Sequence, residues 1–240
     1  MKIFWDTIAT YNSCTWPVQA IIIIIAIALT ALLINRPSHA IRIAMKVFII
    51  AVYLWIAIGY YAVFCAERNY TRVMTIFWIV LAVAWVWDAI TDYTTFEHST
   101  HHRVLAYSLL MLPLFYPLIS LLRGMSIPFV ASPVMPSSVA TFTIGLLLLF
   151  HRRVNFFIVL LLCHWSLIGL TKTYYFNIPE DFVLAVVCIP AIYIFFHDNF
   201  LSNASATSKP SIRVLNAMLI TGCSVIGIFL LASILIVFMK

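Results

Sequence analysis

The chain has 240 residues, of which 64% are hydrophobic and only 9% are charged, and its formal net charge is +6. A soluble domain carries about 45–50% apolar and about 25% charged residues. Because a compact soluble fold must present much of its surface to water, this composition excludes a water-soluble protein. The charged residues are too few for a nucleic-acid-binding surface, so we expect no nucleic-acid partner.

The apolar runs predict an all-α, polytopic bundle of transmembrane helices. A helix needs about 20 apolar residues to cross the hydrocarbon core of a bilayer. Nothing in the chain shows the alternating pattern of a β-barrel, so helices are the expected structure. We expect about eight of them, with seven as the alternative. In chain order they lie near residues 17–35, 43–65, 71–91, 104–122, 138–151, 153–171, 181–197 and 212–239.

The last predicted helix stands apart from the others. A polar segment of low complexity, residues 198–211, separates it from the preceding apolar run. We therefore expect three parts: a seven-helix transmembrane core over residues 1–197, the polar linker, and an appended transmembrane helix over residues 212–240.

The shortest predicted helix of the core is 138–151. Only His151, Arg152 and Arg153 separate it from the following apolar run. Two structures are compatible with so short a connection and so short a run. The segment either forms a tight antiparallel hairpin with 153–171 or is a re-entrant helix that does not cross the membrane.

Clusters of basic residues predict the orientation of the chain. They adjoin apolar runs at Arg36, Arg42 and Lys46, and again at Arg152 and Arg153. Positive residues favour the cytoplasmic side and anionic lipid head groups, so we expect both termini outside.

On that orientation, three segments share the outer face: the N-terminal tail, the proline-rich loop 124–137 and the loop 172–181. All three are candidates for the cap of a vestibule. The alternative is that they lie in the membrane interface, where aromatic residues are common.

Carboxylates and histidines follow one another at the end of the third predicted helix. Asp88 and Asp92 are four residues apart, which places both carboxylates on one helix face. His98, His101 and His102 come next, at helical spacing. Such a set can bind a divalent metal or relay protons. The alternative is a solvated helix end with mixed polar residues.

A second group lies deeper in the predicted bundle. Cys163 and His164 are in the sixth helix and Cys188 is in the seventh, and the two thiols fall at similar depth if these helices run antiparallel. Thiol and imidazole ligands suit a soft metal. The alternative is that the cysteines pack as small hydrophobic residues and the histidine bonds a neighbouring helix.

A polar pair is predicted at the loop before the seventh helix. Lys172 lies across this loop from Asp181, close enough in sequence to pair with it. The pair would matter for function if it closed a gate. The alternative is ordinary helix-start chemistry, because Asp181 follows Pro179 in the first turn.

Prolines inside the predicted helices favour kinks. Pro113 and Pro117 lie in the fourth helix and Pro190 lies in the seventh, and each removes a backbone hydrogen bond. Transporters use broken helices to expose backbone carbonyls to substrates. Membrane helices without such a role also contain proline, so the kinks favour a permease without excluding other functions.

Short motifs along the chain resemble an uncharacterised family of small bacterial multi-pass inner-membrane proteins, a domain of unknown function sometimes labelled as a transporter permease. The resemblance covers about residues 4–197 and implies a helical membrane fold in the cell inner membrane, with no assigned activity. The motifs are Tyr11-Asn12, Trp16-Pro17, Tyr116-Pro117, Thr141-Phe142-Thr143, Gly145-Leu146-Leu147, Trp165, Ile168-Gly169, and Pro179 with Asp181.

Three functions remain open at this point. The first is a small permease or channel for an ion or small solute, with a path of ionisable groups: Asp88, Asp92, His164, Lys172 and Asp181. The second is an accessory subunit of a larger membrane complex, which would make it an oligomer or a complex partner. The third is a membrane-embedded enzyme that holds a divalent or soft metal. The absence of phosphate-loop, HExxH and GxSxG motifs favours a role other than catalysis.

Overall fold

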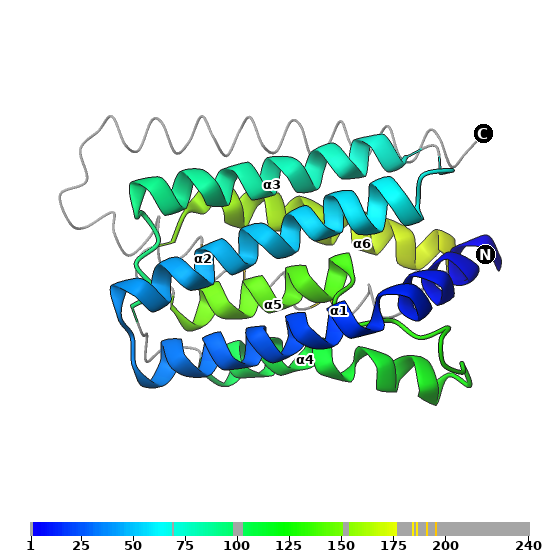
Figure 1. The fold of residues 1–240 in the computed structure, drawn as a ribbon, viewed down its shortest axis with the longest axis horizontal. Coiled ribbons are helices and arrows are strands. Elements are labelled where there is room, and N and C mark those ends of the chain that lie inside the picture. The colour runs from blue at the N-terminus through cyan, green and yellow to red at the C-terminus, as the bar shows by residue number, and fades with distance from the viewer. Residues whose placement is uncertain are drawn as a thin grey trace. The chain divides into compact units, whose positions relative to one another are not determined.

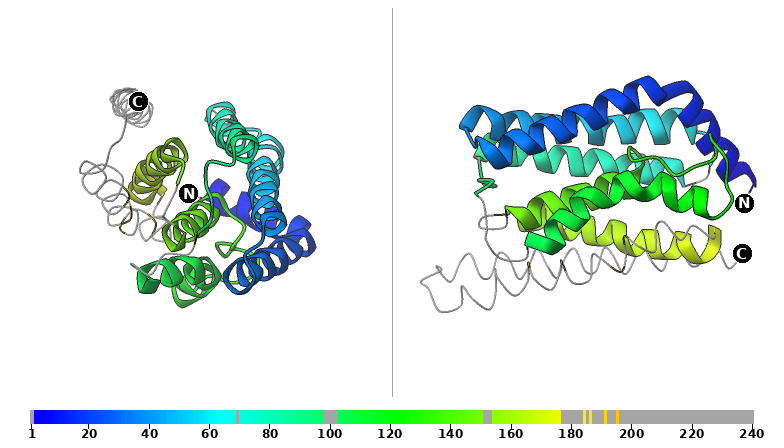
Figure 2. Two further views of the ribbon diagram at one scale, coloured as in Figure 1. Left: turned by 90° about the vertical axis from the view of Figure 1, so that its left-hand side faces the viewer. Right: turned by 90° about the horizontal axis from the view of Figure 1, so that it is seen from below.

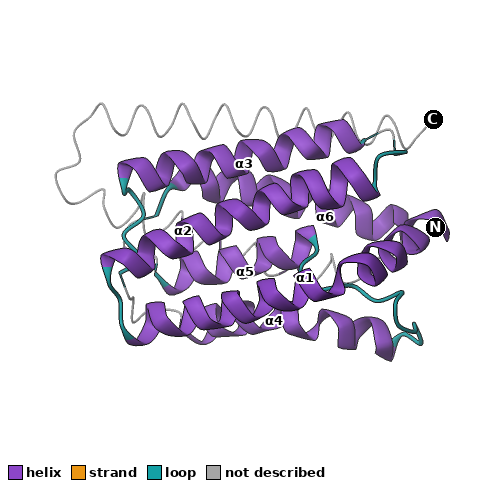
Figure 3. Ribbon diagram, viewed as in Figure 1, coloured by secondary structure: helices purple, strands orange, loops and turns teal. Residues whose placement is uncertain are grey.

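A computed structural model describes residues 2–68, 70–97, 103–150 and 154–176, together with the single positions 184, 186, 191 and 195. Within these residues every regular element is a helix and no strand occurs (Figure 3). The elements are α1 (Lys2–Asn35), α2 (His39–Leu54), η1 (Trp55–Phe64), α3 (Thr71–Thr91), α4 (Arg103–Leu122), α5 (Pro136–Leu149) and α6 (Phe156–Phe176).

Four helices are long and apolar enough to cross a membrane: Phe4–Asn35, His39–Phe64, Thr71–Thr91 and Arg103–Leu122. They correspond to the first four predicted segments, of which the first is longer than predicted. The predicted total of eight is not confirmed, because the segments near 181–197 and 212–239 lie outside the described residues apart from single positions. The linker and the appended helix also lie outside them.

The first helix begins at Lys2, whereas the apolar run predicts a start near residue 17. The expectation of a separate N-terminal tail is therefore wrong. The tail is helical because Phe4, Ile8 and Tyr11 recur at the spacing of one helix face, and all three are buried. Pro17 lies inside this helix.

The second membrane-length helix changes its winding midway. α2 continues directly into η1, a π-helical segment. Its wider hydrogen-bond spacing continues to its end, where the backbone N–H of Cys65 donates to the carbonyl of Tyr60 at 3.1 Å. Together α2 and η1 form the single span His39–Phe64.

The chain divides into two compact units, residues 1–155 and 156–240. In the first, α1 contacts α2 and α2 contacts α3, and α4 packs on α5 (Figures 1 and 2). α5 has 14 residues and is therefore about 21 Å long, less than the roughly 30 Å of a hydrocarbon core. The alternatives of a hairpin or a re-entrant helix stay predictions, since 151–153 lie outside the described residues.

α4 and α5 run antiparallel and approach each other closely. The hydroxyls of Tyr116 and Thr141 are 3.1 Å apart, and four residues further along α5 the backbone of Gly145 faces Leu109 and Leu110 of α4. A Cβ atom built on Gly145 would lie 2.8 Å from the backbone nitrogen of Leu110. Only glycine permits this separation, as is common where membrane helices pack.

The loop between α4 and α5, residues 123–135, is fastened to the N-terminal half of α1 (Figure 2). The side-chain amide of Asn12 donates hydrogen bonds to the carbonyls of Pro128 and Val130, both at 2.8 Å. The loop therefore rests against α1, which satisfies carbonyl groups that have no partner within the loop.

Candidate functional site

Lys46 is completely buried on α2, inside a helix that is long and apolar enough to cross a membrane. It lies on one helix face with His39 and Arg42, at spacings of three and four residues. A buried ammonium group is stable only when carboxylates and other acceptors surround it. The partners of Lys46 therefore define the site.

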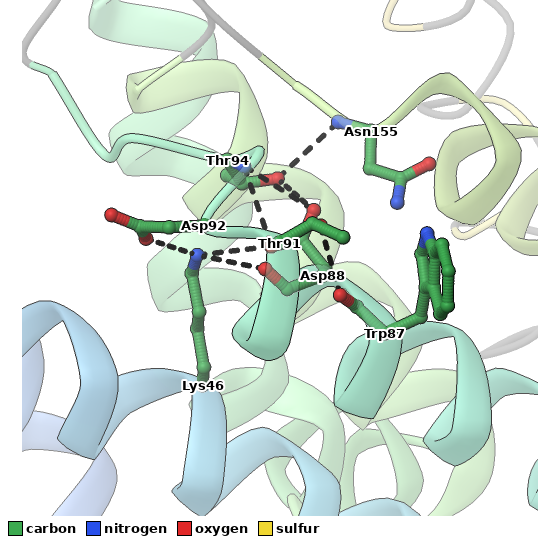
Figure 4. Close-up of polar contacts among 7 residues, drawn as sticks. All are labelled: Lys46, Trp87, Asp88, Thr91, Asp92, Thr94 and Asn155. Carbon is green, nitrogen blue, oxygen red and sulfur yellow. Dashed lines mark hydrogen bonds and ion pairs between the residues drawn. The ribbon is translucent and has the colours of Figure 1, made fainter.

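The ammonium group of Lys46 bonds to two carboxylates of α3 and its C-terminal turn (Figure 4). The Nζ atom lies 3.1 Å from Oδ2 of Asp88 and 2.8 Å from Oδ1 of Asp92, and it donates to the backbone carbonyl of Asp88 at 3.3 Å. These three acceptors match the three donors of a lysine side chain.

The two carboxylates differ in their access to solvent. The side chain of Asp88 is completely buried, whereas that of Asp92 is 46% exposed. Lys46 thus joins an interior carboxylate to one at the surface of the first unit.

Thr94 completes the surroundings of Asp88. Its hydroxyl donates to Oδ1 of Asp88 at 2.8 Å, and its backbone N–H lies 3.3 Å from the same oxygen. The hydroxyl of Thr94 also accepts a hydrogen bond from the backbone N–H of Asn155 at 3.3 Å (Figure 4). The interior carboxylate is therefore held by a lysine and by two donors of one threonine.

The end of α3 brings these groups together. Asp92 adopts a left-handed backbone conformation with φ of 45°, which aspartate tolerates better than most residues. The backbone N–H groups of Asp92 and Tyr93 both point to the carbonyl of Asp88, as is usual where a left-handed residue ends a helix. The chain then turns back, and Thr94 reaches the Asp88 carboxylate.

Lys46 lowers the pKa of Asp92 below its ordinary value of 3.8, chiefly through the hydrogen bond between them, and the charges of His39 and Arg42 act in the same direction. A group whose pKa is depressed by folding stabilises the folded state above its unfolded pKa. That contribution to stability is lost as the pH falls through the lower pKa that Asp92 has in the folded state.

We expect Asp92→Asn to lose stability relative to the unchanged chain near neutral pH, with the difference shrinking below about pH 3.9. The expected difference is less than about 1 kcal/mol, because solvent screens a half-exposed pair. Thermal unfolding in detergent between pH 3 and pH 7 measures it. Asp6→Asn, at an exposed position of α1, is the control, and a difference that grows towards acid pH would contradict the expectation.

The structure brings two of the predicted path residues together. Asp88 and Asp92 share Lys46, in agreement with their predicted common face, even though α3 ends at Thr91. The sequence predicts Lys46 in a basic cluster beside the membrane surface and not as a site residue, whereas the structure buries it between the two carboxylates. The signal was present: the predicted helix 43–65 contains this lysine, and a charge within an apolar helix requires a partner.

The remaining candidate residues stay predictions. His164 lies on α6, where its Nδ1 atom is 2.6 Å from the carbonyl of Leu160 one turn earlier, and Cys163 beside it is half-buried. Lys172 lies on the same helix. Among the described residues no three histidine, cysteine, aspartate or glutamate side chains gather to hold a metal. The other candidates lie outside the described residues: His98, His101, His102, Asp181 and Cys188.

Comparison with known proteins agrees with the resemblance noted from the motifs. No curated protein matches the chain, and no solved structure matches it. A family model, described as a family of unknown function (DUF6064), matches residues 1–206. This is most of the chain, including all of the residues around Lys46, Asp88 and Asp92. The chain belongs to the DUF6064 family, a family of unknown function.

Proposed function

We propose that the protein is a multi-pass protein of the cell inner membrane that acts as a small permease for a cation, with the proton as its simplest cargo. One observation carries the proposal. Lys46 and Asp88 are fully buried in two helices of membrane-crossing length, and Asp92 connects them to solvent. An ionisable group within a membrane costs about 2.5–3.5 kcal/mol on insertion scales, so groups retained there are functional candidates.

The groups bonded to one another at the site favour a cation. One lysine bonds to two carboxylates, so these three groups carry one excess negative charge when all are ionised, and the charge of Arg42 acts on Asp92 from the same face of α2. A carboxylate is the group here that can accept a proton or bind a small metal cation. Pro113 and Pro117 inside α4 also support a permease, since interrupted helices are frequent in transporters.

The two carboxylates suggest how a proton would enter. Asp92 is open to solvent, and its carboxylate holds Lys46 at 2.8 Å. Protonation of Asp92 removes the charge that attracts the ammonium group and leaves Lys46 bound to Asp88 alone. Each proton that arrives therefore changes the partners of the buried lysine, which is the kind of two-state element that coupled transport needs.

The test is proton flux into liposomes that contain the purified protein and an internal pH dye, driven by a potassium diffusion potential with valinomycin. We expect flux well above that of empty liposomes. In Asp92→Asn we expect at least a tenfold lower flux, because the solvent-facing carboxylate can no longer take a proton. The matched control is Asp6→Asn, which removes an exposed carboxylate of α1. We expect this variant to leave the flux unchanged.

Sodium and potassium are tested as alternative cargoes in liposomes of the same composition without valinomycin, with an internal dye for the cation in question. Flux of either cation that is lost in Asp92→Asn identifies a metal cation as the cargo and supports the permease. Flux equal to that of empty liposomes for all three cations would refute the permease.

A further inference from the structure

Two hollows adjoin each other in the first unit. The first has a volume of about 210 Å³ and an almost wholly apolar wall, to which α1 contributes Ala26, Thr30 and Ile34. The α2, α4 and α5 helices supply the rest of its lining. The second has a volume of about 280 Å³ and a mixed wall that includes Arg42 and Glu97. Ile34 lines both hollows, so the two are neighbours along α1.

Each hollow contains a buried polar atom without a partner. Among the described residues, the Nε atom of Arg42 and the Oγ1 atom of Thr30 are buried and make no hydrogen bond. An unsatisfied buried donor destabilises the fold, and a helical threonine normally bonds to the carbonyl one turn earlier. Both atoms therefore lack a hydrogen-bond partner within the described part of the protein, beside a hollow that their own residue lines.

Along the two hollows, a cationic group, a hydroxyl and an apolar wall follow one another. A phospholipid has matching groups in the same order: a phosphate, an ester and an acyl chain. Arg42 offers a guanidinium group, which binds phosphate oxygens well. Thr30 precedes Ile34 by four residues, and therefore lies about 6 Å deeper along α1, where it can donate to an ester carbonyl. Beyond it the wall is apolar and suits an acyl chain.

We propose that the two hollows together bind one glycerophospholipid of the surrounding bilayer. Its phosphate lies at Arg42, its glycerol ester lies near Thr30, and one acyl chain fills the apolar hollow. The carboxylate of Glu97 lines the same polar hollow as Arg42, which favours a headgroup with a positive amine, such as phosphoethanolamine, over a purely anionic one. This lipid site includes none of Lys46, Asp88 and Asp92, and it stands whether or not the protein is a permease.

The test is lipid retention by the full chain in mild detergent, measured by native mass spectrometry and by lipid extraction. We expect about one phosphatidylethanolamine per chain. Arg42→Gln removes the phosphate contact, and Ala26→Phe fills the apolar hollow, so both lower retention about tenfold. Arg36→Gln is the matched control, because Arg36 is an exposed basic residue near the same end of α1. Thermal unfolding checks that all variants fold.

Equal retention in the unchanged chain and in both site variants would overturn the proposal, since such lipid binds the outer surface without a specific site. Two competition measurements distinguish a lipid from a free anion and one headgroup from another. Inorganic phosphate that displaces dioleoyl phosphatidylethanolamine from the delipidated and reloaded protein would show an anion site without a lipid, against the proposal. Equal competition by dioleoyl phosphatidylglycerol would overturn the assignment of a headgroup with an amine.

Discussion

Replacing Lys46 by methionine lowers the free energy of unfolding by about 3–5 kcal/mol. The methionine retains most of the volume of the lysine stem but removes the charge, so Asp88 loses its cation while its side chain stays fully buried. Thr94 still donates to the Asp88 carboxylate, but a neutral hydroxyl does not replace an ammonium group. The loss of Lys46 affects Asp92 less than Asp88, because the carboxylate of Asp92 is half-exposed and can be hydrated. Thermal unfolding in detergent, followed by circular dichroism, measures the change.

The double variant Lys46→Met/Asp88→Leu distinguishes a lost ion pair from a lost side chain. It removes both buried charges, and exchanging a buried pair for apolar residues is often neutral or stabilising. We therefore expect it to recover most of the loss seen in Lys46→Met. Arg36→Met is the control for an exposed basic residue, with a change below about 0.5 kcal/mol. A double variant as unstable as Lys46→Met would show that the lysine acts through packing and not through charge.

The helices of the first unit could be predicted where hydropathy alone decides their bounds. The segment 71–91 is present as Thr71–Thr91, because a predominantly apolar run over residues 73–87 has charged or polar residues at both ends and leaves little choice of bounds. The start of α1 could not be found in this way. Its first turns mix exposed Asp6 with buried Ile8 and Tyr11, so their signal is the periodicity of one face and not the mean hydropathy.

The candidate site was half predictable. The spacing of Asp88 and Asp92 placed their carboxylates on one face, and the charges inside an apolar helix marked them for a function. The contacts of Lys46 could not be predicted from local spacing. Asp88 is 42 positions and Asp92 is 46 positions along the chain from Lys46, beyond the end of its own helix. The role of Thr94 depends on a left-handed turn at Asp92, and aspartate at a helix end does not specify that conformation.

Gly145→Ala is the second change for which we expect a large effect, about 1–3 kcal/mol of lost stability. The added methyl group would lie 2.8 Å from both the Cβ of Leu109 and the backbone nitrogen of Leu110, and 3.1 Å from the carbonyl oxygen of Ala106. Two of these three atoms belong to the backbone of α4 and cannot move aside as a flexible side chain can. The α4–α5 pair must therefore separate, which also weakens the hydrogen bond between Tyr116 and Thr141.

Gly59→Ala tests whether the close approach is the cause, since it makes the same chemical change elsewhere in the first unit. A Cβ atom at Gly59 would meet only the ring of Trp55, at 3.4 Å, which is an ordinary packing distance. We expect it to alter stability by less than about 1 kcal/mol. If the two variants unfold at the same temperature, the separation of α4 and α5 is not limited by Gly145. If only Gly145→Ala is destabilised, the two helices are packed backbone to backbone beside Leu110 and Thr143, which line the apolar hollow.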